Sequence, residues 1–202
     1  GTDDMGRLAS ALSLDRIYAD PNRLITFLDN HDLPRFASRC DRTQAESALR
    51  LMVGLRGQPS ITWGSEVLED GAEEPENRHS FSGDTEHPAN AWITALLQLR
   101  KESPALQYGQ TRILHLDAQS MVFLRIHGEH AALVGLSTQN EFHYALPEWL
   151  HNEELATLVG KPKASENNLV FPVGTSMVLF EPSAAIGVRA NDLRQEAQQA
   201  PT

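Results

Sequence analysis

An apolar run followed directly by polar side chains is the feature of this sequence that most restricts its fold. Residues 24–28 read Leu-Ile-Thr-Phe-Leu, and after Asp29 the chain continues as Asn30, His31 and Asp32. Such a run is typical of a strand buried on both faces, as strands of parallel sheets are. In parallel α/β folds, functional side chains follow the carboxyl ends of the strands. The segment therefore predicts a parallel strand that presents Asn30, His31 and Asp32 at a functional edge.

The first half of the chain alternates between helical and strand patterns. The spacing of apolar side chains predicts helices at about residues 6–17, 43–57 and 88–102, with Thr43 as the cap of the second. A second strand is expected at residues 60–64, which are β-prone and precede a long polar loop. Helices that alternate with strands in this way are typical of a parallel α/β architecture.

After about residue 105 the pattern changes to short β-rich runs separated by turn residues. Two of these runs flank residues 127–130, His-Gly-Glu-His, which are typical of a hairpin turn. Short strands at this spacing indicate a small antiparallel sandwich. The predicted fold class is therefore α/β followed by all-β. The expected strands are residues 120–126, 131–137, 141–146, 154–159, 169–171 and 176–180.

Charge and cysteine content exclude several classes of protein. The chain has 17 basic and 27 acidic residues, and its net charge of -10 repels a nucleic acid backbone. Cys40 is the only cysteine, which excludes an intramolecular disulfide and a cysteine metal cluster. No apolar run reaches the about 18 residues of a membrane-spanning helix, and the acidic first residues do not resemble a signal peptide. We predict no nucleic acid partner and no membrane partner, and the localisation stays unknown.

The Asn-His-Asp segment and four further segments, in the same order, resemble the alpha-amylase family (glycoside hydrolase family 13). Residues 27–32 match the family pattern Phe-x-x-Asn-His-Asp. Residues 57–66 look like the eighth barrel strand, and residues 74–78, Glu-Pro-Glu-Asn-Arg, are similar to a loop of the cyclomaltodextrinase and neopullulanase-like branch. Residues 96–109 resemble the last barrel helix and its exit, and residues 176–180 resemble the closing strand of the C-terminal β domain.

This resemblance implies a fold and an activity. Residues 1–105 would form the C-terminal part of a (β/α)8 TIM barrel with strands 7 and 8, and residues 106–182 an antiparallel β-sandwich domain. Residues 183–202 would be a tail, either helical or disordered. The implied activity is retaining hydrolysis of alpha-glucosidic bonds, in which one carboxylate attacks the sugar and another protonates the leaving oxygen. The substrate would be an alpha-glucan or a maltooligosaccharide.

The resemblance also assigns roles to five residues. Asp32 would be the third carboxylate of the family, which stabilises the transition state, and His31 would hold a hydroxyl of the same sugar. Asn30 would shape the strand end, while Arg78 and Trp63 would line the cleft. The nucleophile Asp and the acid Glu of the family lie upstream of its Asn-His-Asp segment, and the sequence has no counterpart of either. We therefore expect a C-terminal portion of a longer enzyme, inactive alone, whose partner is the missing N-terminal part of the barrel.

Three alternatives stay open at this point. Asn and Asp at a strand end can simply form turn hydrogen bonds. A metallophosphoesterase also ends a strand with Asn-His, but its motif begins with Gly where this chain has Asp29. A non-catalytic carbohydrate-binding or domain-interface module would need exposed aromatic side chains, for which the candidates are Tyr108, Phe142, Tyr144 and Trp149.

No cofactor and no metal site are predicted. His127 and His130 are close in sequence, and a hairpin turn accounts for them better than a metal does. The loop at residues 66–86 is strongly acidic, and calcium binding is an alternative there. We expect a solvated rim instead, because its acids show no regular ligand spacing. These acids are Glu66, Glu69, Asp70, Glu73, Glu74, Glu76, Asp84 and Glu86.

Overall fold

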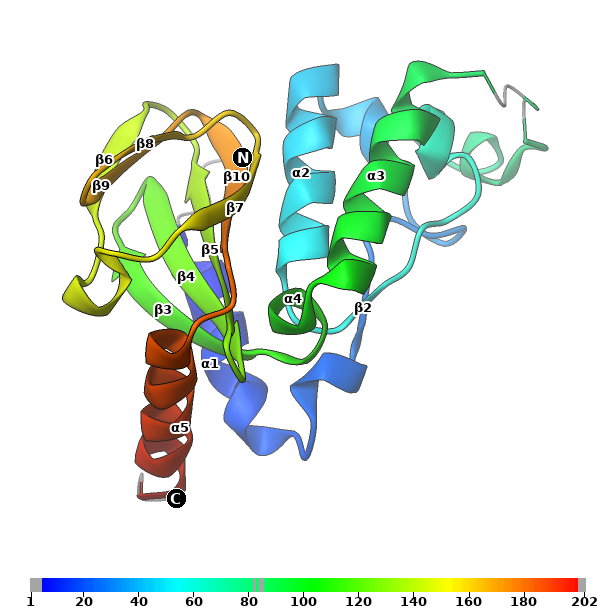
Figure 1. Cartoon of the computed structure of the whole chain (residues 1–202). Coiled ribbons are helices and arrows are strands. Elements are labelled where there is room, and N and C mark those ends of the chain that lie inside the picture. Colours follow the sequence, from blue (N-terminus) through cyan, green and yellow to red (C-terminus); the bar gives the residue numbers. More distant parts are fainter. Residues whose placement is uncertain (1–4, 82, 84–85, 200–202) are drawn as a thin grey trace.

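The computed structural model describes residues 5–81, 83 and 86–199, and places a helical part beside a β part (Figure 1). The helical part consists of α1 (Met5–Ser13), β1 (Ile25–Thr26), α2 (Arg42–Gly54), β2 (Gln58–Pro59), α3 (Pro88–Glu102) and α4 (Pro104–Tyr108). Short 3-10 turns lie at Leu14–Ile17, Pro21–Arg23, Phe36–Arg39, Ser65–Val67, Glu76–Arg78 and Glu148–Leu150. No helix in the described part of the chain has the length and apolar character to cross a membrane.

The two strands of the helical part are parallel and adjacent. The backbone N–H groups of Gln58 and Ser60 donate to the carbonyl oxygens of Leu24 and Thr26, each at 2.7 Å. Because the strands are parallel, their carboxyl ends lie at the same edge, and α2 forms the crossover between them. Two parallel strands and their helices agree with part of the expected barrel, but the described residues contain no closed barrel.

Two expectations for these strands are wrong. The second strand lies at β2 instead of residues 60–64, where the Arg35 side chain donates to the Trp63 carbonyl oxygen and the Thr62 hydroxyl donates to the Asp29 carbonyl oxygen. The first strand is not buried on both faces, since Ile25 is 67% exposed and Phe27 is 46% exposed. Leu28 packs on the helices, but no described residue covers the outer sides of Ile25 and Phe27.

The three helices expected from sequence are present as α1, α2 and α3, but α1 ends at Ser13, α2 ends at Gly54, and the cap of α2 differs. Asp41 caps α2 instead of Thr43: the Gln44 N–H donates to the Asp41 carboxylate at 2.9 Å, and the Gln44 side chain accepts from the Asp41 N–H at 3.0 Å. A carboxylate at this position satisfies one of the free N–H groups of the first turn. The start of the helix therefore lies before Thr43, at Arg42.

The β part contains two antiparallel sheets. The larger sheet has the strand order β3-β4-β5-β10-β7 and the smaller one β6-β9-β8. The six strands expected from sequence are confirmed, and β3 and β8 are additional. The strands are β3 (Gln110–Leu116), β4 (Ser120–His127), β5 (His130–Ser137), β6 (Phe142–Ala145), β7 (Leu155–Val159), β8 (Lys163–Ser165), β9 (Asn168–Phe171) and β10 (Gly174–Phe180).

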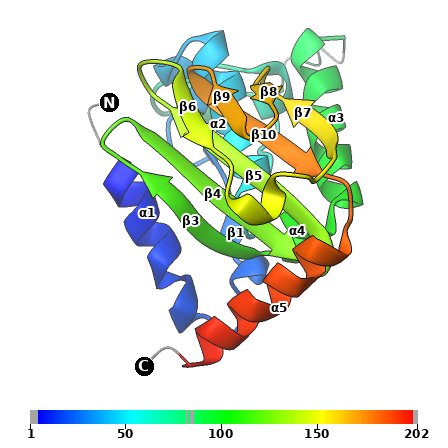
Figure 2. The ribbon, with the colours of Figure 1, turned by 60° about the vertical axis from the view of Figure 1, so that its left-hand side comes forward.

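The larger sheet is the central layer of the molecule (Figure 2). One of its faces packs on α1, α2 and α4, and the other packs on the smaller sheet and on α5 (Ala184–Gln199). On β4, Phe123 therefore faces the helices while Leu124 faces the smaller sheet, and both are buried. The end of the chain is thus helical up to Gln199, and residues 200–202 lie outside the described residues.

A buried arginine holds the end of α2. The Arg100 guanidinium on α3 donates to the carbonyl oxygens of Val53 at 2.5 Å and Leu55 at 2.9 Å, and also to that of Gly57. The last carbonyl groups of a helix have no partner within the helix, so this side chain satisfies them. Burial lowers the pKa of Arg100 to about 10.

We expect Arg100→Met to lower the free energy of unfolding by about 3 kcal/mol, because it leaves buried carbonyl groups without a donor. Urea unfolding followed by circular dichroism measures this change. The matched control is Lys101→Met at the exposed neighbouring position. Equal stability of the two variants would contradict the assigned role of Arg100.

The turn between β3 and β4 depends on one carboxylate. Asp117 accepts hydrogen bonds from the Ser120 hydroxyl and from the N–H groups of Gln119 and Ser120, each at 2.7 Å. These bonds, the one from the Ser120 hydroxyl above all, hold the pKa of Asp117 at about 2. The carboxylate form is therefore stabilised in the folded state.

A lowered pKa means that the stabilisation is present above the unfolded value, about 3.9, and is lost as the pH falls toward 2. We expect Asp117→Asn to flatten the pH dependence of stability in this window. Urea midpoints between pH 2 and pH 5 measure it, with Asp192→Asn at an exposed position of α5 as control. Parallel curves for wild type and Asp117→Asn would disprove the assignment.

Candidate active site

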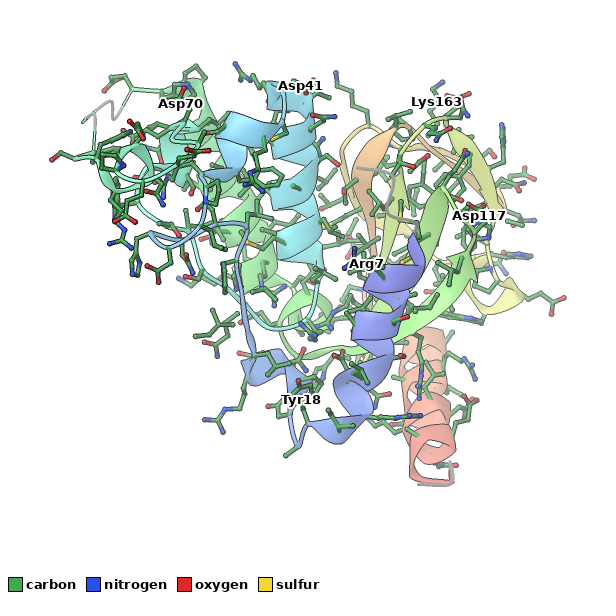
Figure 3. All side chains as sticks on the ribbon, turned by 180° about the vertical axis from the view of Figure 1, so that it is seen from behind. Arg7, Tyr18, Asp41, Asp70, Asp117 and Lys163 are labelled. Carbon is green, nitrogen blue, oxygen red and sulfur yellow. The ribbon has the colours of Figure 1, made fainter. Side chains whose placement is uncertain are left out.

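The loops that follow β1 and β2 meet at one end of the helical part. Asp41, at the start of α2, and Asp70, in the loop after β2, lie at this end, and Tyr18 lies at the opposite one (Figure 3). The arrangement follows from the parallel pairing, because both strands point the same way. Segments about 45 positions apart in the sequence therefore share one surface.

The strand expected at residues 24–28 is shorter, at Ile25–Thr26, and after three further residues the Asn-His-Asp segment forms a turn. The Asn30 side chain accepts a hydrogen bond from the Asp32 N–H at 2.9 Å, so this amide holds the turn together. The side chains of His31 and Asp32 are 66% and 62% exposed, and His31 Nε2 lies 3.4 Å from Asp32 Oδ2. An imidazole and a carboxylate are thus presented side by side on an open surface.

Arg78 comes to this surface from the loop after β2. Its Nη2 donates to Asp32 Oδ1 at 2.9 Å, and its Nε donates to the His31 carbonyl oxygen at 3.0 Å. Its Nη1 lies 3.3 Å from the carboxylate of Glu74. The buried Asn77 donates to the carbonyl oxygen of His31 at 3.1 Å. The loop at residues 74–78 is therefore clamped onto the Asn-His-Asp turn.

Trp63 lies next to this cluster, after β2, and its side chain is partly exposed. The His79 ring meets the indole edge at a centroid distance of 6.3 Å, and the Arg35 guanidinium lies 4.9 Å from the ring centroid. His79 follows Arg78 directly, so Trp63 is joined to the Asp32 cluster through it. A hydrogen bond with the Ser80 carbonyl, and a further one with that of Asp70, raise the pKa of His79.

Asp29 and Arg35, which sequence reasoning did not single out, lie buried beneath this surface. Both flank the Asn-His-Asp turn, and charged residues so near a functional motif were the available signal. Their burial depends on tertiary packing and cannot be read from the sequence. Asp29 also lines a small pocket under the site together with Phe36, Ile61 and Ser65.

The structure gives less support to the other sequence-based candidates. Among the described residues there is no group of three or more His, Cys, Asp or Glu side chains that could hold a metal ion. Within the acidic loop, Asp84 lies outside the described residues. Phe142, Tyr144 and Trp149 pack against the core of the β part, whereas Tyr108 is 58% exposed.

The chain is similar to enzymes that act on alpha-glucans. It is 31% identical over 209 aligned residues to a cyclomaltodextrin glucanotransferase of Bacillus sp. (strain 38-2), covering 94% of this chain and 29% of the relative. It is 34% identical over 149 residues to an alpha-amylase of Niallia circulans, covering 72% of this chain and 28% of the relative. No family model matches the chain.

The fold agrees with that of solved enzymes of the same kind. An Anoxybacillus alpha-amylase superposes with a TM-score of 0.76 at 22% identity, covering 91% of this chain and 44% of that one. A gamma-cyclodextrin glucanotransferase of alkalophilic Bacillus clarkii superposes with a TM-score of 0.70 at 24% identity, covering 90% and 30%. The chain belongs to the alpha-amylase family, glycoside hydrolase family 13. It spans less than a third of the length of the curated relatives that it matches.

Arg78, whose side chain is 46% exposed, is expected to stabilise the Asn-His-Asp turn locally and to add little to the stability of the whole fold. We expect Arg78→Ala to change the free energy of unfolding by less than about 1 kcal/mol, because ion pairs between exposed side chains contribute little. Amide hydrogen exchange at Asp32, whose N–H donates to the Asn30 side chain, should nevertheless become faster, since the turn loses a clamp. The control is Arg42→Ala, which removes an exposed ion pair with Glu46 on α2. Unchanged exchange in Arg78→Ala would contradict the clamp.

Proposed function

We propose that this chain is the C-terminal portion of a retaining enzyme of the alpha-amylase family that acts on alpha-glucans. The observation that carries the proposal is the pairing of Asp32 with Arg78 at 2.9 Å, beside His31, at the carboxyl ends of adjacent parallel strands. Active sites of parallel α/β enzymes are built at such ends. The names of the relatives, glucanotransferases and alpha-amylases, point to the same substrate class.

In this proposal Asp32 acts on the transition state. Retaining glycosidases use two carboxylates about 5 to 5.5 Å apart, one as nucleophile and one as acid, and pass through an oxocarbenium-like state. A third carboxylate that binds sugar hydroxyls more tightly in that state than in the relaxed ring lowers the barrier. Arg78 fixes the orientation of the Asp32 carboxylate, and His31 binds a hydroxyl of the same sugar. Trp63 offers an apolar surface beside them.

The nucleophile and the acid would come from an N-terminal part of the barrel that pairs with β1. The support is the exposed apolar side of β1, where Ile25 and Phe27 lie open, and an adjoining groove along α2 that includes Leu51 and Leu55. In the described part of the chain β1 pairs with β2 alone, so its other backbone edge is free to pair with another strand. We therefore expect this chain alone to be inactive. Hydrolysis and transglycosylation share the glycosyl-enzyme intermediate and differ in the acceptor that reaches it.

We expect Asp32→Asn in the complete enzyme to lower kcat on soluble starch by about 100-fold or more, as removal of an interaction specific to the transition state does. The melting temperature should stay unchanged, because the side chain is exposed. Steady-state kinetics with differential scanning fluorimetry measure both quantities. Asp192→Asn on α5 is the control. Near-normal turnover in Asp32→Asn would remove Asp32 from the mechanism.

A further inference from the structure

Two buried charges lie under the exposed cluster. Asp29 is 4% exposed and Arg35 is 1% exposed, and Arg35 Nη1 lies 3.7 Å from Asp29 Oδ1. Removing two charges from water is costly, and such a pair often adds little to stability. The role of the pair therefore follows from the hydrogen bonds that each side chain makes to neighbouring segments.

Asp29 connects the loop after Asp32 with the segment after β2. Its Oδ2 accepts from the Phe36 N–H at 2.8 Å, and its Oδ1 accepts from the Ser65 hydroxyl at 3.1 Å. Its backbone carbonyl accepts from the Thr62 hydroxyl at 2.8 Å. Substitution of this one side chain would therefore remove the bonds to Phe36 and Ser65, one in each segment.

Arg35 connects the same segments with the loop that carries Arg78. Its Nη2 donates to the Trp63 carbonyl oxygen, its guanidinium lies against the Trp63 ring, and its N–H donates to the Gly71 carbonyl oxygen at 2.9 Å. Gly64 lies against the guanidinium with φ of 89°, and a Cβ at this position would collide with Arg35 and with the Glu69 carboxylate. A side chain at position 64 would therefore force the Arg35 and Glu69 side chains to move, and the positive φ would strain it as well.

We propose that Asp29 and Arg35 are positioning residues, which set the places of Asp32 and Trp63 at the sugar-binding surface. This inference rests on the function proposed above. Neither side chain is exposed to substrate, so the pair acts through the turn and the indole. A displacement of about 1 Å in a catalytic group can lower a rate by about 100-fold, which is the scale of effect that such a pair controls.

A second ion pair of this chain serves as the matched control. Arg56 Nε donates to Asp15 Oδ1 at 2.7 Å, and both side chains are largely buried. Asp15 lies in the 3-10 turn after α1, and Arg56 follows α2. If burial of an ion pair matters only for stability, the Asp15 and Asp29 pairs should behave alike.

The test is a double-mutant cycle in the complete enzyme. We expect Asp29→Asn and Arg35→Lys each to lower kcat by about 10- to 100-fold with KM within about twofold, because the lost positioning acts in the transition state. In an Asp32→Asn background, Asp29→Asn should lower kcat by less than about twofold, since its effect passes through Asp32. Maltosyl fluoride as an activated substrate keeps this slow background measurable. Asp15→Asn should leave kcat unchanged and lower only the melting temperature.

Three outcomes would overturn the proposal. The first is an equal loss of kcat when Asp29→Asn is introduced into the wild-type enzyme and into the Asp32→Asn variant. The second is a lower melting temperature of Asp29→Asn with unchanged kcat. If Asp29→Asn does not fold, Ser65→Ala, which removes a single hydrogen bond to Asp29, takes its place, and an unchanged kcat in that variant would be the third. Failure of the proposed function has a different signature, because Asp32→Asn itself would then retain its activity.

Discussion

The structure depends first on the parallel pairing of β1 with β2. Two backbone hydrogen bonds of 2.7 Å, from Gln58 to Leu24 and from Ser60 to Thr26, set the register of the strands. This register decides that the loops after both strands emerge at one edge, and so that Arg78 reaches Asp32. A shift by one residue would turn the side chains to the opposite faces and separate the two. The candidate site is thus a consequence of strand pairing.

Buried arginines tie the loops of the helical part to its helices and to the β part. Arg100 satisfies the carbonyl groups at the end of α2. Arg125 on β4 donates to Asn22 at 2.8 Å and to the Leu106 carbonyl oxygen at 3.0 Å, and burial lowers its pKa to about 9. Arg35 likewise joins the loops at the site by hydrogen bonds to the carbonyl oxygens of Trp63 and Gly71. Strands β1 and β2 pair over only two residues each, so few backbone hydrogen bonds hold this region. Arginine side chains, with five N–H donors each, supply further hydrogen bonds.

The sequence predicted the helices, six strands and the hairpin at residues 127–130, because each has a local periodic signal. It failed where partners distant in sequence decide the outcome. Residues 60–64 have the composition of a strand, but the Thr62 hydroxyl donates to the Asp29 carbonyl oxygen and the Trp63 carbonyl oxygen accepts from Arg35. β3 was missed because its polar and apolar residues do not alternate clearly, and it is stabilised by pairing with β4. The family and the exposed residues of the candidate site were predicted, whereas the buried pair beneath them was not.

The sequence by itself determined the order of the elements, the position of Asn30, His31 and Asp32 at a strand end, and the membership of the alpha-amylase family, since these reside in local pattern and motif spacing. The tertiary structure alone decided that Arg78 contacts Asp32 and that Asp29 and Arg35 are buried together. The physical reason is that hydrogen bonds and burial join residues of separate segments. Local propensity carries no information about such partners, because they become neighbours only when the parallel strands pair.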